Sequence, residues 1–153
     1  MEFSGKYLIK ASRQLVWQGL NDEKILQETI FGCQKISWVS ENKLEVQILV
    51  NFGVIKKNFV GFLELSNVEP ALKYTLSGKG KGGILGKVHA SADIELKDEG
   101  ENTILEFSAF GGGSSAIMSL GKSIIGSSAQ KIIDRFFERF ANAMQVEIIV
   151  LDE

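Results

Sequence analysis

The chain has 153 residues, of which 44% are hydrophobic and 24% charged, and its net charge is −2. This length suits a single domain over residues 1–153, and a near-neutral charge argues against a general nucleic-acid binder, which would be basic. One Cys excludes an internal disulfide and multi-Cys metal sites, and one His excludes metal sites that need two. We therefore expect no metal, no cofactor and little scope for catalysis.

The N-terminal third predicts one strand and two short helices. Residues 2–10 alternate apolar and polar side chains, as a half-buried strand does. Ser12 is placed to cap a first helix, and Asn21 or Asp22 to cap a second one. Gly32 marks the end of this helical segment.

The middle of the chain predicts a sheet and the last third a helix. Alternation returns over residues 32–110 and predicts about six further antiparallel strands with one solvated face. Asp98–Asn102 is typical of a hairpin turn, and Gly111–Gly113 is expected to end the sheet. Residues 115–144 predict one amphipathic helix that covers the sheet. Its apolar stripe is Met118, Gly121, Ile125, Ala129, Ile132, Phe136, Phe140 and Ala143.

This order predicts an α+β protein in which a curved antiparallel sheet of about seven strands grips a long C-terminal helix. Phe136, Phe137 and Phe140 would fill one end of the space between sheet and helix. Elsewhere the inward strand faces carry small residues, so either the helix packs very close or a hollow remains. Both interpretations stay open, with the glycines marking the expected empty space. The small inward residues are Gly5, Gly61, Gly78, Ala90, Ala92 and Ala109.

The motifs that resemble catalytic or phosphate sites are weak. Residues 116–123 fit a relaxed phosphate loop, but the intervening residues are apolar and helical. Gly78–Gly83 offers backbone amides and two lysines without a helix start, and we interpret it as a flexible hairpin or a lid. His89, Ser91 and Asp93 alternate on one solvated strand face, where they cannot form a relay with an oxyanion hole. We predict no catalytic residue.

Two further features bear on reactivity and on contacts. Cys33 has only the basic residue Lys35 near it in the sequence, so we expect a buried or half-buried thiol rather than a nucleophile. Ile117, Leu120 and Ile124 project away from the helix stripe, which makes the first turns apolar on nearly every side. Either loops cover these side chains, or they form an apolar rim beside the hollow that meets a partner or a membrane.

Several segments resemble the G-subunit family of carbon monoxide dehydrogenase, which belongs to the START-like, SRPBCC superfamily. The similarity covers nearly the whole chain, and its motifs are mostly structural. The matching segments are Phe3-x-Gly5-x-Tyr7-x-Ile9, Val16-Trp17-x-x-Leu20-Asn21-Asp22, Ile30–Cys33, Ile55–Phe59 with Gly61, Gly78–Gly83, Ala92-x-Ile94-x-Leu96, Asn102-Thr103-x-Leu105, Leu120-Gly121-x-x-x-Ile125 and Phe136-Phe137.

The resemblance implies a helix-grip (START-like) fold around a hydrophobic cavity. It further implies a non-catalytic accessory protein that binds a lipid, isoprenoid or quinone-like molecule and assists or recruits a molybdenum hydroxylase-type carbon monoxide dehydrogenase. From the inward pattern we predict a ligand site of thirteen residues. They are Trp38, Val46, Ile48, Leu63, Tyr74, Leu76, Ala90, Ala92, Phe107, Met118, Gly121, Ile125 and Ala129.

Two other functions remain open. One is an enzyme, a START-like cyclase or hydrolase acting on an apolar ligand, which would need a titratable group that points inward. The other is a ligand-free module for protein–protein contact or membrane recruitment. Residues 1–6 lack the pattern of a signal peptide, and no apolar run is long enough to span a bilayer. We therefore expect a cytoplasmic protein, with peripheral attachment to the inner membrane surface left open and no nucleic-acid partner.

Overall fold

The computed structural model describes residues 1–52, 55–81 and 86–151. Within these ranges the chain forms a single sheet of eight antiparallel strands together with four helices. In chain order these are β1 (Glu2–Ile9), α1 (Arg13–Leu20), α2 (Glu23–Thr29), β2 (Cys33–Ser40), β3 (Lys43–Phe52), β4 (Ile55–Glu69), β5 (Lys73–Lys81), β6 (Lys87–Glu99), β7 (Asn102–Gly113), α3 (Ser115–Met118), α4 (Lys122–Met144) and β8 (Ile148–Val150).

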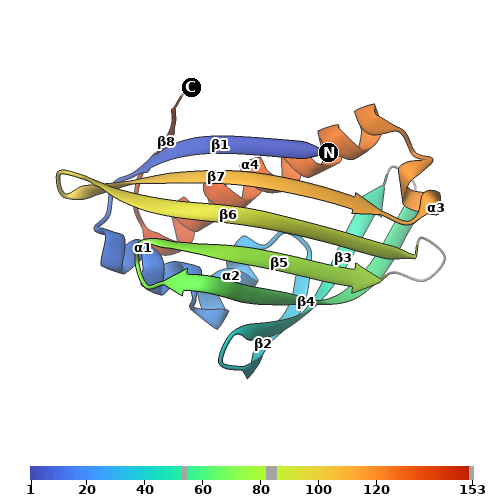
Figure 1. Ribbon diagram of the computed structural model, residues 1–153, viewed down its shortest axis with the longest axis horizontal. Helices are drawn as coiled ribbons and strands as arrows, with labels where there is room; N and C mark the ends of the chain where they lie inside the picture. The colour runs from blue at the N-terminus through green and yellow to red at the C-terminus, as the bar shows by residue number, and fades with distance from the viewer. Residues whose placement is uncertain (53–54, 82–85, 152–153) are drawn as a thin grey trace.

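The strands follow one another along the sheet except at one end. Their order is β2-β3-β4-β5-β6-β7-β1-β8, so the first strand lies between β7 and the last strand. The long helix α4 runs behind the sheet, while α1 and α2 lie at the opposite end from α3 (Figure 1). This is the predicted α+β arrangement of a curved antiparallel sheet around a C-terminal helix.

The local signals at the first helices and at one hairpin act as predicted. The Ser12 hydroxyl accepts a hydrogen bond from the Leu15 backbone N–H and caps α1. Of the two candidates for the second cap, Asp22 is the one used, and its carboxylate accepts from the Ile25 N–H at 3.1 Å. The hairpin between β6 and β7 turns at Gly100, whose φ of 62° favours glycine.

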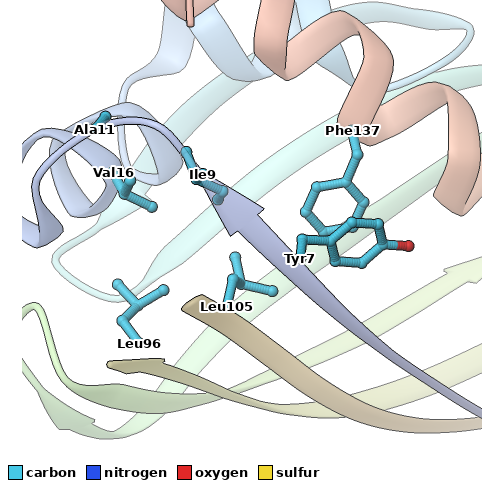
Figure 2. Packing of buried hydrophobic residues seen from close by; sticks show 7 residues of the cluster. All are labelled: Tyr7, Ile9, Ala11, Val16, Leu96, Leu105 and Phe137. Carbon is cyan, nitrogen blue, oxygen red and sulfur yellow. The ribbon is translucent and has the colours of Figure 1, made fainter. Parts of the chain in front are cut away.

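The main apolar core lies where β1 crosses between α4 and the helix α1. The Tyr7 and Phe137 rings stack with centroids 3.8 Å apart, and Ile9 and Val16 beside them are fully buried (Figure 2). Phe140 is fully buried as well. The aromatic end predicted from the sequence is therefore present, and it anchors α4 to β1.

The prediction of one long helix over residues 115–144 is wrong, because the structure has two helices there, α3 and α4. Gly121 adopts a φ of 93° and precedes the first residue of α4. The break changes which side chains face inward. Ile117 is buried and Met118 is exposed, the reverse of the prediction. In α4 the inward isoleucine is Ile133 rather than Ile132, which is 42% exposed.

Two glycine-rich segments expected in loops belong to strands. Gly78–Lys81 continues β5 and pairs with β4 and β6, while Gly82 and Gly83 lie outside the described residues. Gly111–Gly113 continues β7 and pairs with the start of β6. β7 therefore runs three residues beyond Phe110, where the alternation was expected to end, and it stops at Gly113. The short strand β8, which pairs with β1, was not predicted.

Two of the glycines expected beside empty space are closely packed. A Cβ atom on Gly5 would lie 2.6 Å from the Phe107 ring, so that ring already occupies the space. A Cβ atom on Gly61 would lie 2.3 Å from the Lys79 carbonyl oxygen. At Gly121, in contrast, no described atom lies within 4 Å of that position. Only the last of the three fits the expectation of open space.

Candidate functional site

The inner face of the sheet changes from large to small side chains along its strands. At the end near α1 the paired residues Tyr7, Leu105 and Leu96 are buried. In the next row on the same face, Phe107 pairs with Ile94, and Ile94 pairs with Tyr74. Beyond this row the inner face consists mainly of alanine and glycine. The register places Ala92 beside Leu76 and Ala109, and Ala90 beside Gly78 and Gly111.

We call Gly78, Ala90, Ala92, Ala109 and Gly111 the small-residue floor. None of the five is buried, and Ala90 is exposed although it shares a face with buried Leu96. None of them belongs to any of the three apolar clusters of the core. The small-residue floor therefore lies outside the buried apolar clusters of the described residues.

The floor lies between two filled regions. On the α1 side is the main core of Tyr7 and Phe137. At the other end Phe59 and Ile117 form a small buried cluster, against which Val88 and Ile125 pack. At the edge of the sheet, the Met1 side chain reaches α4, because a Cβ atom on Gly126 would lie 2.9 Å from the Met1 Cε atom.

The main close backbone contacts of α4 are with α2, and it has a smaller contact with β8. Close packing of α4 on the small-residue floor, one of the two explanations for the small inward residues, is not among these main contacts.

The thirteen predicted ligand residues fall into four groups. Leu76, Ala90 and Ala92 adjoin one another at or beside the floor. Trp38, Val46, Ile48 and Leu63 belong to the apolar cluster beneath α2, and Phe107 borders the main core. The rest lie as follows: Tyr74 on β5, Met118 on α3, Gly121 between the two helices, and Ile125 and Ala129 on α4.

Among these residues Tyr74 has the most distinctive surroundings. It is 6% exposed, and its ring meets that of Trp17 edge to face at 5.1 Å. Burial raises the pKa of the Tyr74 hydroxyl far above its ordinary range. The group therefore stays protonated at neutral pH and offers a hydrogen bond, but it cannot act as a base.

Three residues that were not predicted as site residues from the sequence lie near the small-residue floor: Met1, Phe59 and Ile117. Phe59 could have been predicted, because it belongs to the alternating inward positions of its strand. Ile117 could not be identified from helical spacing, because the break at Gly121 changes the phase of the helix. Nothing in the pattern of the first residues indicates that Met1 reaches α4.

The residues that resembled catalytic groups lie on the outer face. His89 and Asp93 are exposed, and Asp93 accepts a hydrogen bond from the Thr75 hydroxyl at 2.8 Å. Cys33 is half-buried, and burial raises the pKa of its thiol. Such a thiol is a weak nucleophile at neutral pH, in line with the expectation for Cys33.

The outer face of the sheet also has a hollow of about 820 Å³, which crosses β4, β5, β6, β7 and β1. Most of its lining side chains are polar, including Lys6, Glu106 and Asp93. Glu106 lies 3.5 Å from Lys6 and 3.5 Å from Lys97, both at the surface. Of the predicted ligand residues only Tyr74 and Phe107 reach this hollow. It is a solvated, charge-paired strand surface and a different place from the predicted apolar site.

Solved structures with the same fold extend over the whole chain. A conserved protein from Geobacillus kaustophilus superposes with a TM-score of 0.87 at 23% identity, covering 97% of this chain and 99% of its own. The ZhuI aromatase/cyclase from Streptomyces sp. R1128 gives 0.67 at 11% identity, covering 95% and 93%. Ara h 8.0201 gives 0.67 at 14% identity, covering 95% and 98%. These likenesses show that the chain shares its fold with these solved structures.

No curated protein matches the chain in sequence. Among the described residues no helix combines the length and the apolar character needed to cross a bilayer. The family model for the G subunit of carbon monoxide dehydrogenase (CoxG) matches residues 5–145. With the architecture and the sequence motifs in agreement over almost its whole length, the chain belongs to the carbon monoxide dehydrogenase G-subunit (CoxG) family.

Proposed function

We propose that the protein binds an apolar small molecule between the small-residue floor and the first half of α4. The observation that carries this proposal is the exposure of Ala90 on the inner face of the sheet. A methyl group that faces the helix side of a packed protein is normally buried. An exposed one, flanked by Gly78 and Gly111, indicates space that a ligand would fill.

The chemistry of the surrounding side chains favours a lipid, isoprenoid or quinone-like molecule. Leu63, Leu76 and Ile125 offer aliphatic contacts, and Phe107 offers a ring. The hydroxyl of Tyr74, which is buried and protonated, would donate one hydrogen bond to the ligand. Burying apolar surface is worth roughly 25 cal/mol per Å², so an isoprenoid-sized ligand gains several kcal/mol before the cost of association.

We propose a non-catalytic role for this site. The described histidine and the carboxylate nearest to it on β6, His89 and Asp93, are exposed on the other face of the sheet. Tyr74 holds its proton too firmly to act as a base. Membership of the CoxG family supports an accessory protein that carries its ligand to, or helps to recruit, a molybdenum hydroxylase-type carbon monoxide dehydrogenase.

The test is ligand occupancy. Native mass spectrometry of the purified protein should show an additional apolar mass, and an uncharged naphthalene dye should gain fluorescence on binding. The Ala90→Phe variant should lose both signals because its ring would fill the proposed space. Ser91→Phe places the same ring on the opposite face of β6 and should retain both. Equal dye binding by these two folded variants would contradict the proposal.

A further inference from the structure

The three arginines of this chain have different surroundings. The Arg13 guanidinium donates to the Asp98 carboxylate and to the Ala71 carbonyl, both at 2.8 Å. Arg135 and Arg139, one turn apart on α4, are exposed and form no ion pair with any carboxylate of the described residues. Two unpaired guanidinium groups therefore lie together on one helix.

A single aromatic ring lies beside both groups. The Phe31 ring, in the turn between α2 and β2, has its centroid 4.6 Å from the guanidinium carbon of Arg135 and 5.2 Å from that of Arg139. The packing of α4 against α2 brings this turn to the helix. A ring attracts a guanidinium without offering it an oxygen acceptor, so the N–H donors of both groups are left for water or for a bound anion.

The neighbouring charges do not balance these two cations. Asp134 accepts a hydrogen bond from the Gln130 amide at 2.9 Å, and after burial its charge is the second cause that raises the pKa of the Tyr7 hydroxyl on β1. This carboxylate therefore lies on the β1 side of α4. Like charges one turn apart on a helix repel each other, and an anion bound between the two arginines would remove that repulsion.

Apolar surface adjoins the two arginines. Ile132, three residues before Arg135, is 42% exposed, and Phe31 is half-buried. We call Phe31, Ile132, Arg135 and Arg139 the arginine patch. Arginine and aromatic side chains are enriched at protein–protein interfaces, and clusters of arginine recognise acidic motifs. The composition of the patch is therefore that of a surface for an acidic protein segment.

We propose that the arginine patch binds an acidic segment of a protein partner, with a carboxylate on each guanidinium and an apolar side chain against Ile132. The planar fork of arginine fits a carboxylate through two parallel hydrogen bonds. Glu28 and Glu138, both exposed on the same two helices, disfavour a uniformly anionic bilayer, whereas a protein segment can place its carboxylates over the arginines alone. The inference goes beyond the ligand site and rests on the proposed function only for the existence of a protein partner.

The test measures fluorescence anisotropy of a labelled peptide that alternates glutamate and leucine, titrated with the full chain. We expect binding at low salt that weakens as salt is raised. Arg135→Gln with Arg139→Gln should bind roughly tenfold more weakly or worse, the factor expected for one lost charge-assisted hydrogen bond. Arg135→Lys with Arg139→Lys should lose most of the affinity as well, because it keeps the charge but removes the planar fork.

The matched control is Lys79→Gln with Lys81→Gln, which makes the same change in net charge at two exposed lysines of β5, outside the arginine patch. It should bind the peptide within roughly threefold of the parent, because distant charges act only through screened, long-range attraction. Equal losses in the two glutamine variants would overturn the proposal, as would an absence of binding at low salt or full binding by the arginine-to-lysine variant. Binding to phosphatidylglycerol vesicles that depends on the arginines, without peptide binding, would assign the patch to lipid instead.

Dye binding scores the proposed function separately. The arginine variants should unfold cooperatively and bind the dye like the parent, because their exposed side chains lie outside the small-residue floor. Peptide binding by a protein that never binds the dye would overturn the ligand site alone. Dye binding without peptide binding would overturn the arginine patch alone.

Discussion

The Tyr7 ring on β1 lies against the Phe137 ring on α4, with their centroids 3.8 Å apart and their planes 20° from parallel. This stack is the main contact between the first strand and the long helix in the buried core. The helix is thus fixed to the first strand near its C-terminal half, whereas the ligand space that we propose lies beside its first half. In this arrangement ligand uptake and fold stability would depend on different residues.

Replacing Phe137 with alanine should therefore destabilise the fold strongly. Removing a buried phenyl group costs about 3–5 kcal/mol in comparable cores, and urea denaturation would measure the loss. Phe110→Ala is the control, because Phe110 on the outer face is 57% exposed. Its change should stay within about 0.5 kcal/mol. Similar losses in both variants would mean that the stack does not anchor α4.

The hydroxyl of Thr103 should contribute to stability through one buried hydrogen bond. It is fully buried and donates to the Ala11 carbonyl at 2.8 Å. Thr103→Val keeps the shape but leaves that carbonyl without its donor, at a cost of about 1–3 kcal/mol. Thr103→Ser retains the hydroxyl and should be the more stable of the two variants by thermal denaturation. The opposite order would show that packing of the methyl group dominates.

Two helical glycines should respond to alanine in opposite directions. At Gly126 the added Cβ would meet only the mobile end of Met1, so the gain in helix propensity should stabilise the protein by about 0.5–1 kcal/mol. At Gly19 it would lie 2.5 Å from the Met144 sulfur and 3.1 Å from the Phe140 ring, which is fully buried. Gly19→Ala should therefore be destabilising. Chemical denaturation of both variants checks the two signs.

Stability should fall at alkaline pH because of Tyr74. Its pKa is raised in the folded state, so the unfolded chain loses this proton first as the pH rises. The contribution is complete below pH about 10, the ordinary tyrosine value, and above it declines by about 1.4 kcal/mol per pH unit. Tyr74→Phe should flatten this decline. Parallel curves for the parent and the variant would assign the alkaline loss to other groups.

Alternation in the sequence was sufficient to predict most of the sheet. The turn at Asp98–Asn102 and the caps at Ser12 and Asp22 depend on neighbouring residues, and they are confirmed. The strand β8 has only three residues, too few for an alternating pattern to show. Gly111–Gly113 ends β7 as expected, but its pairing with β6 was not predicted, because glycine has little preference for strands.

The candidate site was harder to predict, because space is a property of neighbours rather than of single residues. Gly5 is small, but the Phe107 ring fills the volume beside it. Ala90 is also small, but its strand partners are Gly78 and Gly111, and it stays exposed. Because of the break at Gly121, Ile117 is buried and Met118 is exposed, the opposite of what was predicted. Helical spacing assumes regular backbone and cannot detect such a change of phase.

The position of β1 between β7 and β8 has a consequence for how the chain folds. Tyr7 pairs with Leu105 on one side and Val150 on the other, both far along the sequence. The pairing of β1 is therefore complete only after strands far along the sequence, β7 and β8, have reached it. Folding dominated by such distant pairings is slow. Until both partner strands are in place, the side chains of Tyr7 and Ile9, which are buried in the folded protein, lack part of their packing.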